Sequence, residues 1–150
     1  MRQLILASAL AALPAAAIAQ DQDPITQAIE ARQGFYTLLG ANMGTLAAMA
    51  KGDIDYDEAA AMQAGNNIEA LTNYSVPMHF IEGSSNADAE GTDALPAIWE
   101  NMDDFRQKFA DLGEAAAGAG DAVAGGQENI GPVIGQLGEA CKACHDQYRD

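Results

Sequence analysis

The sequence predicts an all-α protein built as an antiparallel four-helix bundle. Several stretches repeat apolar side chains at alternating intervals of four and three residues, a spacing that lines the inner seam of a bundle helix. Their connections are short except for one long segment, residues 76–92, which is rich in Gly, Ser, Asn and Asp. The roughly 130 residues that follow the N-terminal segment suit one domain.

The first helix is predicted over residues 24–51. Asp23 is the expected N-cap, Pro24 suits the first helical position, and Gly52 follows Lys51 as a stop. Three further helices are predicted by the same apolar spacing, over about residues 55–75, from 93–96 to about 115, and over about 129–149.

Two of the predicted helix starts have a local explanation. Residues 55–58, Asp-Tyr-Asp-Glu, match a capping box at the start of the second helix. Pro132 is expected in the first turn of the fourth helix, where a missing N–H is tolerated.

The seam of the first helix contains two polar side chains. Its members are Ile25, Ile29, Arg32, Tyr36, Leu39, Met43, Leu46 and Ala50. One interpretation rotates the helix so that Arg32 extends its guanidinium to solvent. The interpretation we favour is that Arg32 and Tyr36 face a buried group that carries charge.

Such a group is indicated by C-x-x-C-H near the end of the chain, formed by Cys141, Cys144 and His145. This motif attaches a c-type haem: each thiol forms a thioether with one haem vinyl group, and the histidine binds the iron. On a helix the three side chains point to one side. We therefore expect one covalent haem c per chain, with His145 as an axial iron ligand.

Other interpretations of the cysteines fit less well. A redox-active dithiol begins a helix within a β–α–β pattern, which is absent here. A zinc site needs four ligands, whereas the chain has two Cys and two His. A disulfide between positions i and i+3 of a helix is awkward. The second histidine, His79, lies in the long loop and is expected at the surface, the alternative being a sixth haem ligand.

Residues 1–19 are predicted to be a secretory signal peptide. Arg2 gives a positive start, residues 4–18 are apolar, and Ala19 closes an A-x-A cleavage site. A retained membrane anchor is the alternative, for which the stretch is short. Residues 20–150 would then be an exported haem-binding bundle, located in a bacterial periplasm.

The composition is strongly acidic. The formal charge is −15 at pH 7, and the loss of Arg2 with the signal peptide makes it −16. This charge repels nucleic acid and anionic membranes, so neither is expected as a partner. It either steers a basic redox partner or serves solubility alone.

Three segments together resemble the cytochrome c′ family. They are Arg32-Gln33, residues 93–99 (DALPAIW) and residues 138–149 (GEACKACHDQYR), and the resemblance extends from about Ile25 to the end of the chain. It implies a four-helix bundle with a C-terminal haem attachment motif. It also implies a homodimer, which the Ala-rich faces of the first two helices favour.

The resemblance also implies roles for single residues. Cys141 and Cys144 match the thioether cysteines, and His145 matches the proximal ligand. The remaining matches are Arg32 and Gln33 near the haem propionates, Asp93 at a further haem contact, Arg149 against the proximal imidazole, and Tyr36 over the distal face.

Tyr36 determines the expected function. A neutral phenol is a poor iron ligand because it must ionise first, so the iron should be five-coordinate and high-spin. A crowded apolar pocket disfavours oxygen and admits nitric oxide or carbon monoxide to ferrous iron. We expect gas binding and one-electron exchange with an unidentified redox partner, without enzymatic catalysis.

Two alternatives remain open. In a six-coordinate, low-spin electron carrier, Met43 would be the second ligand, although it lies about 10 Å from Tyr36 along the helix. A peroxidase would need a distal base, and His79 is the only spare histidine.

Overall fold

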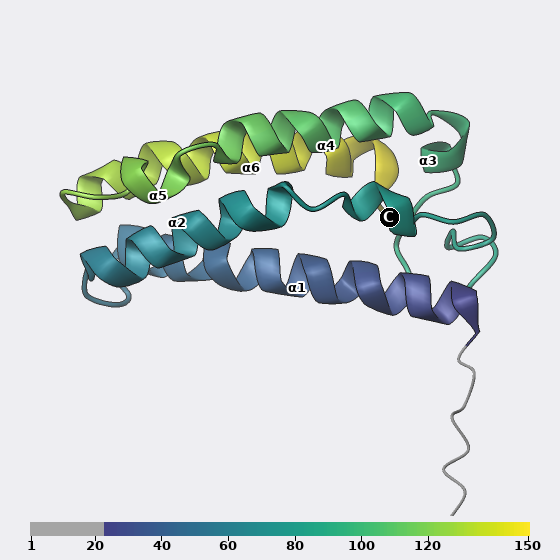
Figure 1. The fold of residues 1–150 in the computed structure, drawn as a ribbon, viewed down its shortest axis with the longest axis horizontal. Helices are drawn as coiled ribbons and strands as arrows, with labels where there is room; N and C mark the ends of the chain where they lie inside the picture. The colour runs from purple at the N-terminus through teal and green to yellow at the C-terminus, as the bar shows by residue number, and fades with distance from the viewer. Residues whose placement is uncertain (1–22) are drawn as a thin grey trace, which may run out of the picture.

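The predicted four-helix bundle is confirmed by the computed structural model, which describes residues 23–150 (Figure 1). The predicted signal peptide lies outside the described residues. The long helices are α1 (Pro24–Lys51), α2 (Glu58–Thr72), α4 (Met102–Ala116) and α6 (Ile130–Tyr148). Two short helices, α3 (Ala97–Glu100) and α5 (Ala119–Ala122), and two 3₁₀ turns, Val76–His79 and Gln127–Asn129, lie in the connections.

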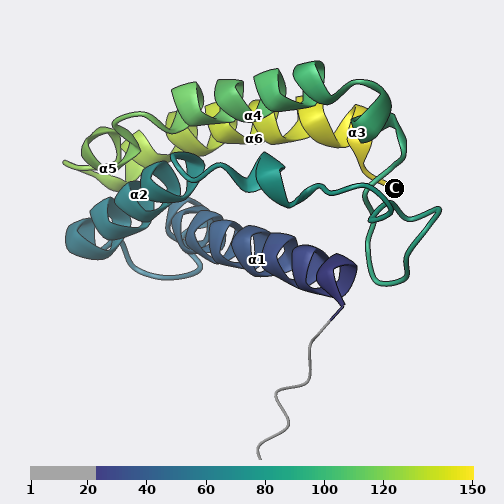
Figure 2. The same cartoon turned by 45° about the vertical axis from the view of Figure 1, so that its right-hand side comes forward.

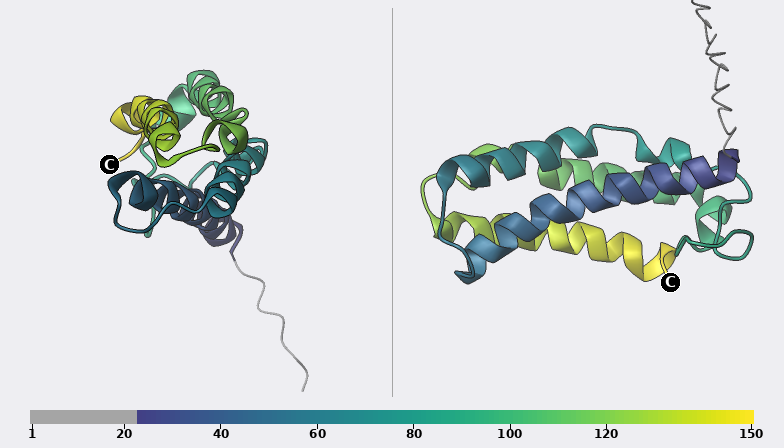
Figure 3. Two further views of the ribbon diagram at one scale, coloured as in Figure 1. Left: turned by 90° about the vertical axis from the view of Figure 1, so that its left-hand side faces the viewer. Right: turned by 90° about the horizontal axis from the view of Figure 1, so that it is seen from below.

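The four long helices form two layers. Helices α1 and α2 make one layer, and α4 and α6 make the other (Figures 1 and 2). Helix α1 contacts both α2 and α6, while α4 contacts the same two helices from the opposite corner, as the end-on view in Figure 3 shows. The first and last long helices are therefore neighbours. No helix in residues 23–150 is long and apolar enough to span a bilayer.

Helix α1 has the predicted bounds because both ends are specified locally. The Asp23 carboxylate accepts a hydrogen bond from the Thr26 backbone N–H at 3.1 Å, and Pro24 occupies the first turn. Gly52 adopts the left-handed conformation, φ 75°, and its N–H returns to the carbonyls of the last turn.

The start of α2 differs from the prediction. Asp57 alone caps the helix, accepting from the Ala60 backbone N–H at 2.9 Å. Because Ala60 occupies the third helical position, no Glu or Gln side chain there can return a bond to the cap. The expected capping box over residues 55–58 is therefore wrong, and α2 begins at Glu58.

The predicted third helix is interrupted at Asn101. This residue lies outside the helical region, with φ −132° and ψ 44°, and it separates α3 from α4. Its side-chain amide donates to the Ala97 carbonyl at 3.2 Å. A short polar side chain that bonds the preceding turn competes with the helical pattern, which explains the break.

The core divides into two clusters along the bundle. The larger cluster joins all four long helices around fully buried side chains such as Leu46, Ile68 and Leu137. The smaller cluster lies where α6 ends and consists of Phe80, Ala94, Ile98, Phe105 and Tyr148. Its members come from the long loop, α3, α4 and α6, so it ties the loop to the end of the chain.

Candidate functional site

The two cysteines lie in the last turns of α6, as predicted, and each packs against a different core cluster. Cys141 lies against the larger cluster, and Cys144 lies against the smaller one. Both side chains are partly buried, and His145 follows in the same helical turn. The helix thus presents the three motif side chains at the junction between the two clusters.

The environment of the thiols argues against a redox-active dithiol. Burial raises the pKa of the Cys141 thiol. Burial also raises the pKa of Cys144 to about 11, against the opposing charge of Lys108. Reactive dithiols need lowered pKa values, because the thiolate is the nucleophile. Within residues 23–150, no three His, Cys, Asp or Glu side chains gather as a metal site would require.

Tyr36 lies across from the cysteines. Burial raises the pKa of its phenol, and the neighbouring Cys144 and Cys141 raise it further, while Arg32 opposes them. The phenol is therefore neutral at physiological pH. Tyr36 is still 37% exposed, and the adjacent Phe35 is the buried aromatic residue of this turn. The predicted seam is wrong here by one residue, because Phe35 fills the core while Tyr36 faces the cysteines.

Arg32 is buried, with 3% of its surface exposed, so the interpretation in which it extends to solvent is wrong. Its guanidinium donates to the Ser84 hydroxyl and carbonyl, each at 3.0 Å, and to the Thr92 hydroxyl at 3.1 Å. It also lies over the Phe80 ring, 4.4 Å from the centroid. Burial lowers its pKa, yet a guanidinium remains charged. Among residues 23–150, no carboxylate forms an ion pair with it.

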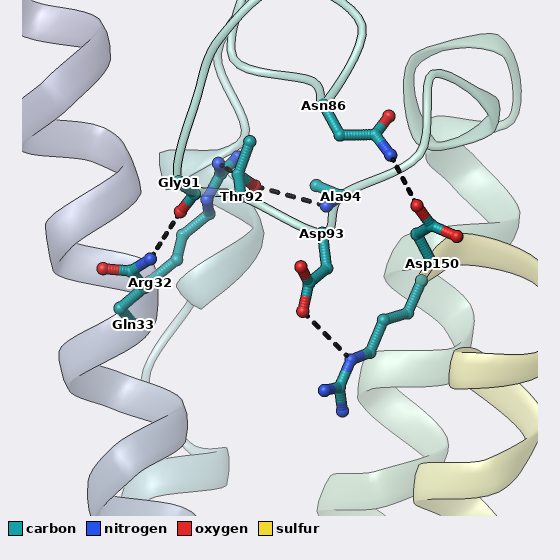
Figure 4. Close-up of polar contacts among 9 residues, drawn as sticks. Arg32, Gln33, Asn86, Gly91, Thr92, Asp93, Ala94 and Asp150 are labelled. Atoms are coloured by element: carbon teal, nitrogen blue, oxygen red, sulfur yellow. Dashed lines mark hydrogen bonds and ion pairs between the residues drawn. The ribbon is translucent and has the colours of Figure 1, made fainter.

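The long loop is fastened to the start of α1. Gln33 donates its side-chain amide to the Gly91 carbonyl at 2.5 Å, beside the bonds of Arg32 (Figure 4). Ser84 and Thr92, which hold Arg32, carry no sequence motif, so they could not be found from the sequence. The two predicted propionate contacts, Arg32 and Gln33, therefore also position this loop.

The same loop is fastened to the end of α6. The Arg149 guanidinium pairs with the Asp93 carboxylate, with Nε and Oδ2 3.5 Å apart. The Asp150 backbone N–H donates to the Asp93 carbonyl at 3.0 Å, and the Asn86 amide reaches the Asp150 carboxylate at 3.5 Å (Figure 4). The structure thus brings Asp93 and Arg149 together, a contact that the sequence did not indicate.

His145 is exposed and lies one turn before Arg149, which pairs with Asp93. Burial and the positive charge of Arg149 lower the pKa of its imidazole, against the opposing carboxylate of Asp146. The neutral imidazole is the form that binds a metal. Arg149 therefore acts on His145 by its charge while its guanidinium is paired with Asp93.

His79, the last residue of the turn Val76–His79, is engaged by Tyr74. The two rings stack at a centroid distance of 5.7 Å, and the Tyr74 hydroxyl hydrogen-bonds to Nε2 of His79. Tyr74 thus engages one of the two imidazole nitrogens that could bind an iron. His79 is partly buried, so the surface placement expected for it holds only in part.

Two buried polar groups in the site fit a flat prosthetic group that carries carboxylates. Arg32 is a buried cation without a carboxylate partner in residues 23–150. Trp99 packs against the same small cluster as Cys144, and its Nε1 atom is buried without a hydrogen-bond acceptor in that part of the chain. A buried donor without an acceptor is costly. A haem, with two carboxylates at one edge, matches this chemistry.

Comparison with known proteins agrees with these features. The family model described as Cytochrome C′ matches residues 27–149. A cytochrome c′ from Cereibacter sphaeroides is 40% identical over 149 residues, covering 99% of this chain and 98% of the relative. A solved cytochrome c′ from Rhodobacter Spheriodes is 38% identical, with a TM-score of 0.79, covering 83% of this chain and 96% of that one.

A further solved cytochrome c′, described as having an unusual ligand-controlled dimer dissociation, is 31% identical with a TM-score of 0.74. It covers 85% of this chain and 96% of that one. The four-helix bundle and its C-x-x-C-H helix define a c-type haem protein. This chain belongs to the cytochrome c′ family. Proteins of this family carry covalently bound haem c, and haem c is the cofactor of this chain.

Proposed function

We propose that this protein is a periplasmic haem protein whose iron is five-coordinate and high-spin. It binds nitric oxide or carbon monoxide in the ferrous state and exchanges single electrons with a redox partner. The observation that carries this proposal is the position of Tyr36, whose phenol is near enough to Cys144 and Cys141 for both to raise its pKa, in addition to the larger effect of burial. The side chain facing the attachment site is therefore bulky and a poor iron ligand.

The attachment residues follow from the motif. Cys141 and Cys144 form the thioethers, and His145 is the axial ligand on the α6 side. The haem supplies an iron that changes charge by one electron and binds small gases. Arg149 favours the neutral, metal-binding form of His145, and its ion pair with Asp93 fixes the end of α6.

Two residues on α1 are proposed to meet the carboxylate edge of the haem. Arg32 is a buried guanidinium with donors beyond the three bonds it makes to Ser84 and Thr92. Gln33 precedes Phe35 by half a turn and is already bonded to the loop at Gly91. Both would bind a propionate while keeping the loop in place.

The alternative, a six-coordinate electron carrier, requires Met43 at the iron. Met43 packs against the larger core cluster, about 10 Å along α1 from Tyr36, toward the end of the bundle where Gln127 contacts Met49. Tyr36, by contrast, is the α1 residue on which both cysteines act electrostatically. The position of Met43 therefore favours the five-coordinate iron.

The coordination state is tested with two substitutions on the same helix. Tyr36→Ala removes the side chain over the open face, so carbon monoxide should bind the ferrous protein faster in flash photolysis. Met43→Leu is the matched control and should leave the absorption spectrum of both oxidation states unchanged. A Met43→Leu protein that turns from low spin to high spin would overturn the gas-binding proposal.

Covalent attachment is tested separately. The intact mass of the purified protein should include one haem, and that haem should remain with the chain after acid–acetone extraction. The mass of the polypeptide should also show removal of residues 1–19, which we propose to be a signal peptide preceding the haem-binding domain, residues 20–150. Haem that extracts freely would contradict thioethers at Cys141 and Cys144.

The partners follow from charge and resemblance. With a formal charge of −16 after loss of Arg2, the protein is proposed to avoid nucleic acid and anionic membranes. A solved relative is described by its dimer dissociation, and we propose that this chain also forms a homodimer.

Because no side chain assigned to the site is a free base beside the open iron face, we propose no enzymatic turnover.

A further inference from the structure

Tyr148 is a buried tyrosine one helical turn after Cys144. Its side chain is 4% exposed, and its ring meets the edge of Phe105 at a centroid distance of 5.4 Å. Cys144 packs against the same cluster. The hydroxyl donates to Oδ2 of Asp104 at 2.6 Å. The phenol therefore lies between the proposed haem attachment point and a carboxylate on the neighbouring helix.

Asp104 connects this phenol to solvent. It lies in the first turn of α4, and its side chain is 53% exposed. Lys108, one turn later, places its ammonium 3.7 Å from the same Oδ2 atom. The same Oδ2 atom thus accepts from Tyr148 and lies near Lys108, on a side chain that is about half exposed to water.

No other aromatic side chain in residues 23–150 combines these features. Tyr56 donates to the Val123 backbone carbonyl, which is not a base. Trp99 packs against the same cluster, but its Nε1–H has no acceptor. Tyr74 does bond to a base, His79, but Tyr74 itself is 47% exposed.

We propose that Tyr148 and Asp104 form a proton-coupled redox pair, which returns an electron to the haem after a peroxide has oxidised it. The proposal rests on the proposed attachment of the haem at Cys144. It adds a function to the gas-binding and electron-exchange site: a defined residue that absorbs an oxidising equivalent from a single, stoichiometric oxidation by peroxide. Such an oxidation is distinct from the catalytic peroxidase turnover that a distal base would support.

The step moves one electron and one proton out of the Tyr148 phenol. A peroxide would take two electrons from the haem protein, together with two protons, and would be reduced to two molecules of water or to an alcohol and water. One electron then passes from the Tyr148 phenol to the oxidised haem. The phenol O–H bond breaks, and its proton forms an O–H bond with Oδ2 of Asp104. The products are a neutral tyrosyl radical, a neutral carboxyl group and a haem that has regained one electron.

The carboxylate is essential to this step. Burial, the hydrogen bond to Asp104 and the charge of that carboxylate raise the pKa of Tyr148 to about 12, so the phenol is protonated at neutral pH. An oxidised phenol is a very strong acid, and a buried radical cation would be severely destabilised. Transfer of the proton to Asp104 removes that charge.

The test uses the ferric holoprotein mixed with one equivalent of hydrogen peroxide and frozen within milliseconds. Electron paramagnetic resonance measures the tyrosyl radical, and the absorption spectrum measures haem content before mixing. Tyr148→Phe keeps the ring and removes the hydroxyl. Asp104→Asn can keep the hydrogen bond but cannot accept the proton. Tyr56→Phe is the matched control, because it removes a bonded hydroxyl far from the haem.

The wild-type protein and Tyr56→Phe should give the same radical signal. Tyr148→Phe should reduce it at least fivefold, and Asp104→Asn should reduce it severalfold while the haem content stays unchanged. An undiminished signal in Tyr148→Phe, or a signal lost only in Tyr74→Phe, would overturn the proposal. Loss of covalent haem in the wild-type protein would instead reject the proposed function on which it rests.

Discussion

Arg32 shows how one residue serves both packing and chemistry. Its guanidinium holds Ser84 and Thr92 from the long loop, and its charge is available to a haem carboxylate. These two roles depend on different properties of the side chain. The hydrogen bonds need the planar fork of five donors, whereas an effect on the reduction potential needs only the positive charge.

Substitutions at Arg32 therefore separate the two roles. Arg32→Leu should lower the free energy of unfolding by about 3 kcal/mol, because buried partners lose their donor. It should also lower the reduction potential, since a nearby positive charge favours ferrous over ferric iron. Arg32→Lys keeps the positive charge, so the reduction potential should stay near that of the wild type. It should still lose most of the stabilisation that the hydrogen bonds of Arg32 provide. Urea unfolding and potentiometric titration measure the two effects, and a potential unchanged in Arg32→Leu would place its charge away from the haem.

Tyr148 also makes stability depend on alkaline pH. Its folded pKa is raised to about 12, above the ordinary value of about 10. Because the folded state holds this proton more tightly, the stabilisation is complete below about pH 10 and is lost as the pH rises through about 12. Tyr148→Phe should lack this dependence. The difference in urea midpoint between the two proteins should shrink over that interval, and a constant difference would contradict it.

At the level of elements, α2 and α5 approach so closely that one glycine is required. A Cβ atom at Gly65 would lie 2.6 Å from the backbone nitrogen of Gly120. Gly65→Ala should therefore destabilise the protein by about 1–3 kcal/mol through overpacking. Gly135, on the exposed face of α6, meets nothing within 4 Å, so Gly135→Ala should stabilise it by up to about 1 kcal/mol. Thermal unfolding followed by circular dichroism compares the two.

The helices show which parts of the fold are readable from sequence. The bounds of α1 were predicted to the residue because Asp23, Pro24 and Gly52 act within one turn of the helix ends. The break at Asn101 was missed because an asparagine inside an apolar periodicity competes with the helix only through its side-chain bond to Ala97.

Some residues of the site could also be predicted from the sequence, and others could not. C-x-x-C-H and the inward position of Arg32 on α1 were readable because their spacing is local. The partners of Arg32 lie in a loop without periodicity, and the sequence does not indicate which of its hydroxyls turn inward. The exchange of Phe35 for Tyr36 in the core has a similar cause. A seam of alternating four and three intervals fixes a face of the helix only to within one position.

At the scale of the whole molecule, the negative charge opposes the proposed homodimer. A homodimer brings together two chains that each carry a formal charge of −16 after loss of Arg2. At about 0.15 M ionic strength the Debye length is about 8 Å, so most of this repulsion is screened. Light scattering should therefore report a dimer at this ionic strength and a shift toward monomer at about 0.01 M. A monomer at high protein concentration and moderate salt would contradict the dimer.

The two faces of the proposed haem site come from opposite ends of the chain, Tyr36 from α1 and the cysteines from α6. Bringing Tyr36 and the cysteines together closes a long stretch of chain, and this closure is entropically costly. The site should therefore form late in folding. Thioethers on α6 would keep the haem on the chain even when α1 has separated from it. Refolding of the denatured holoprotein should then be unimolecular, with a rate that does not change when free haem is added.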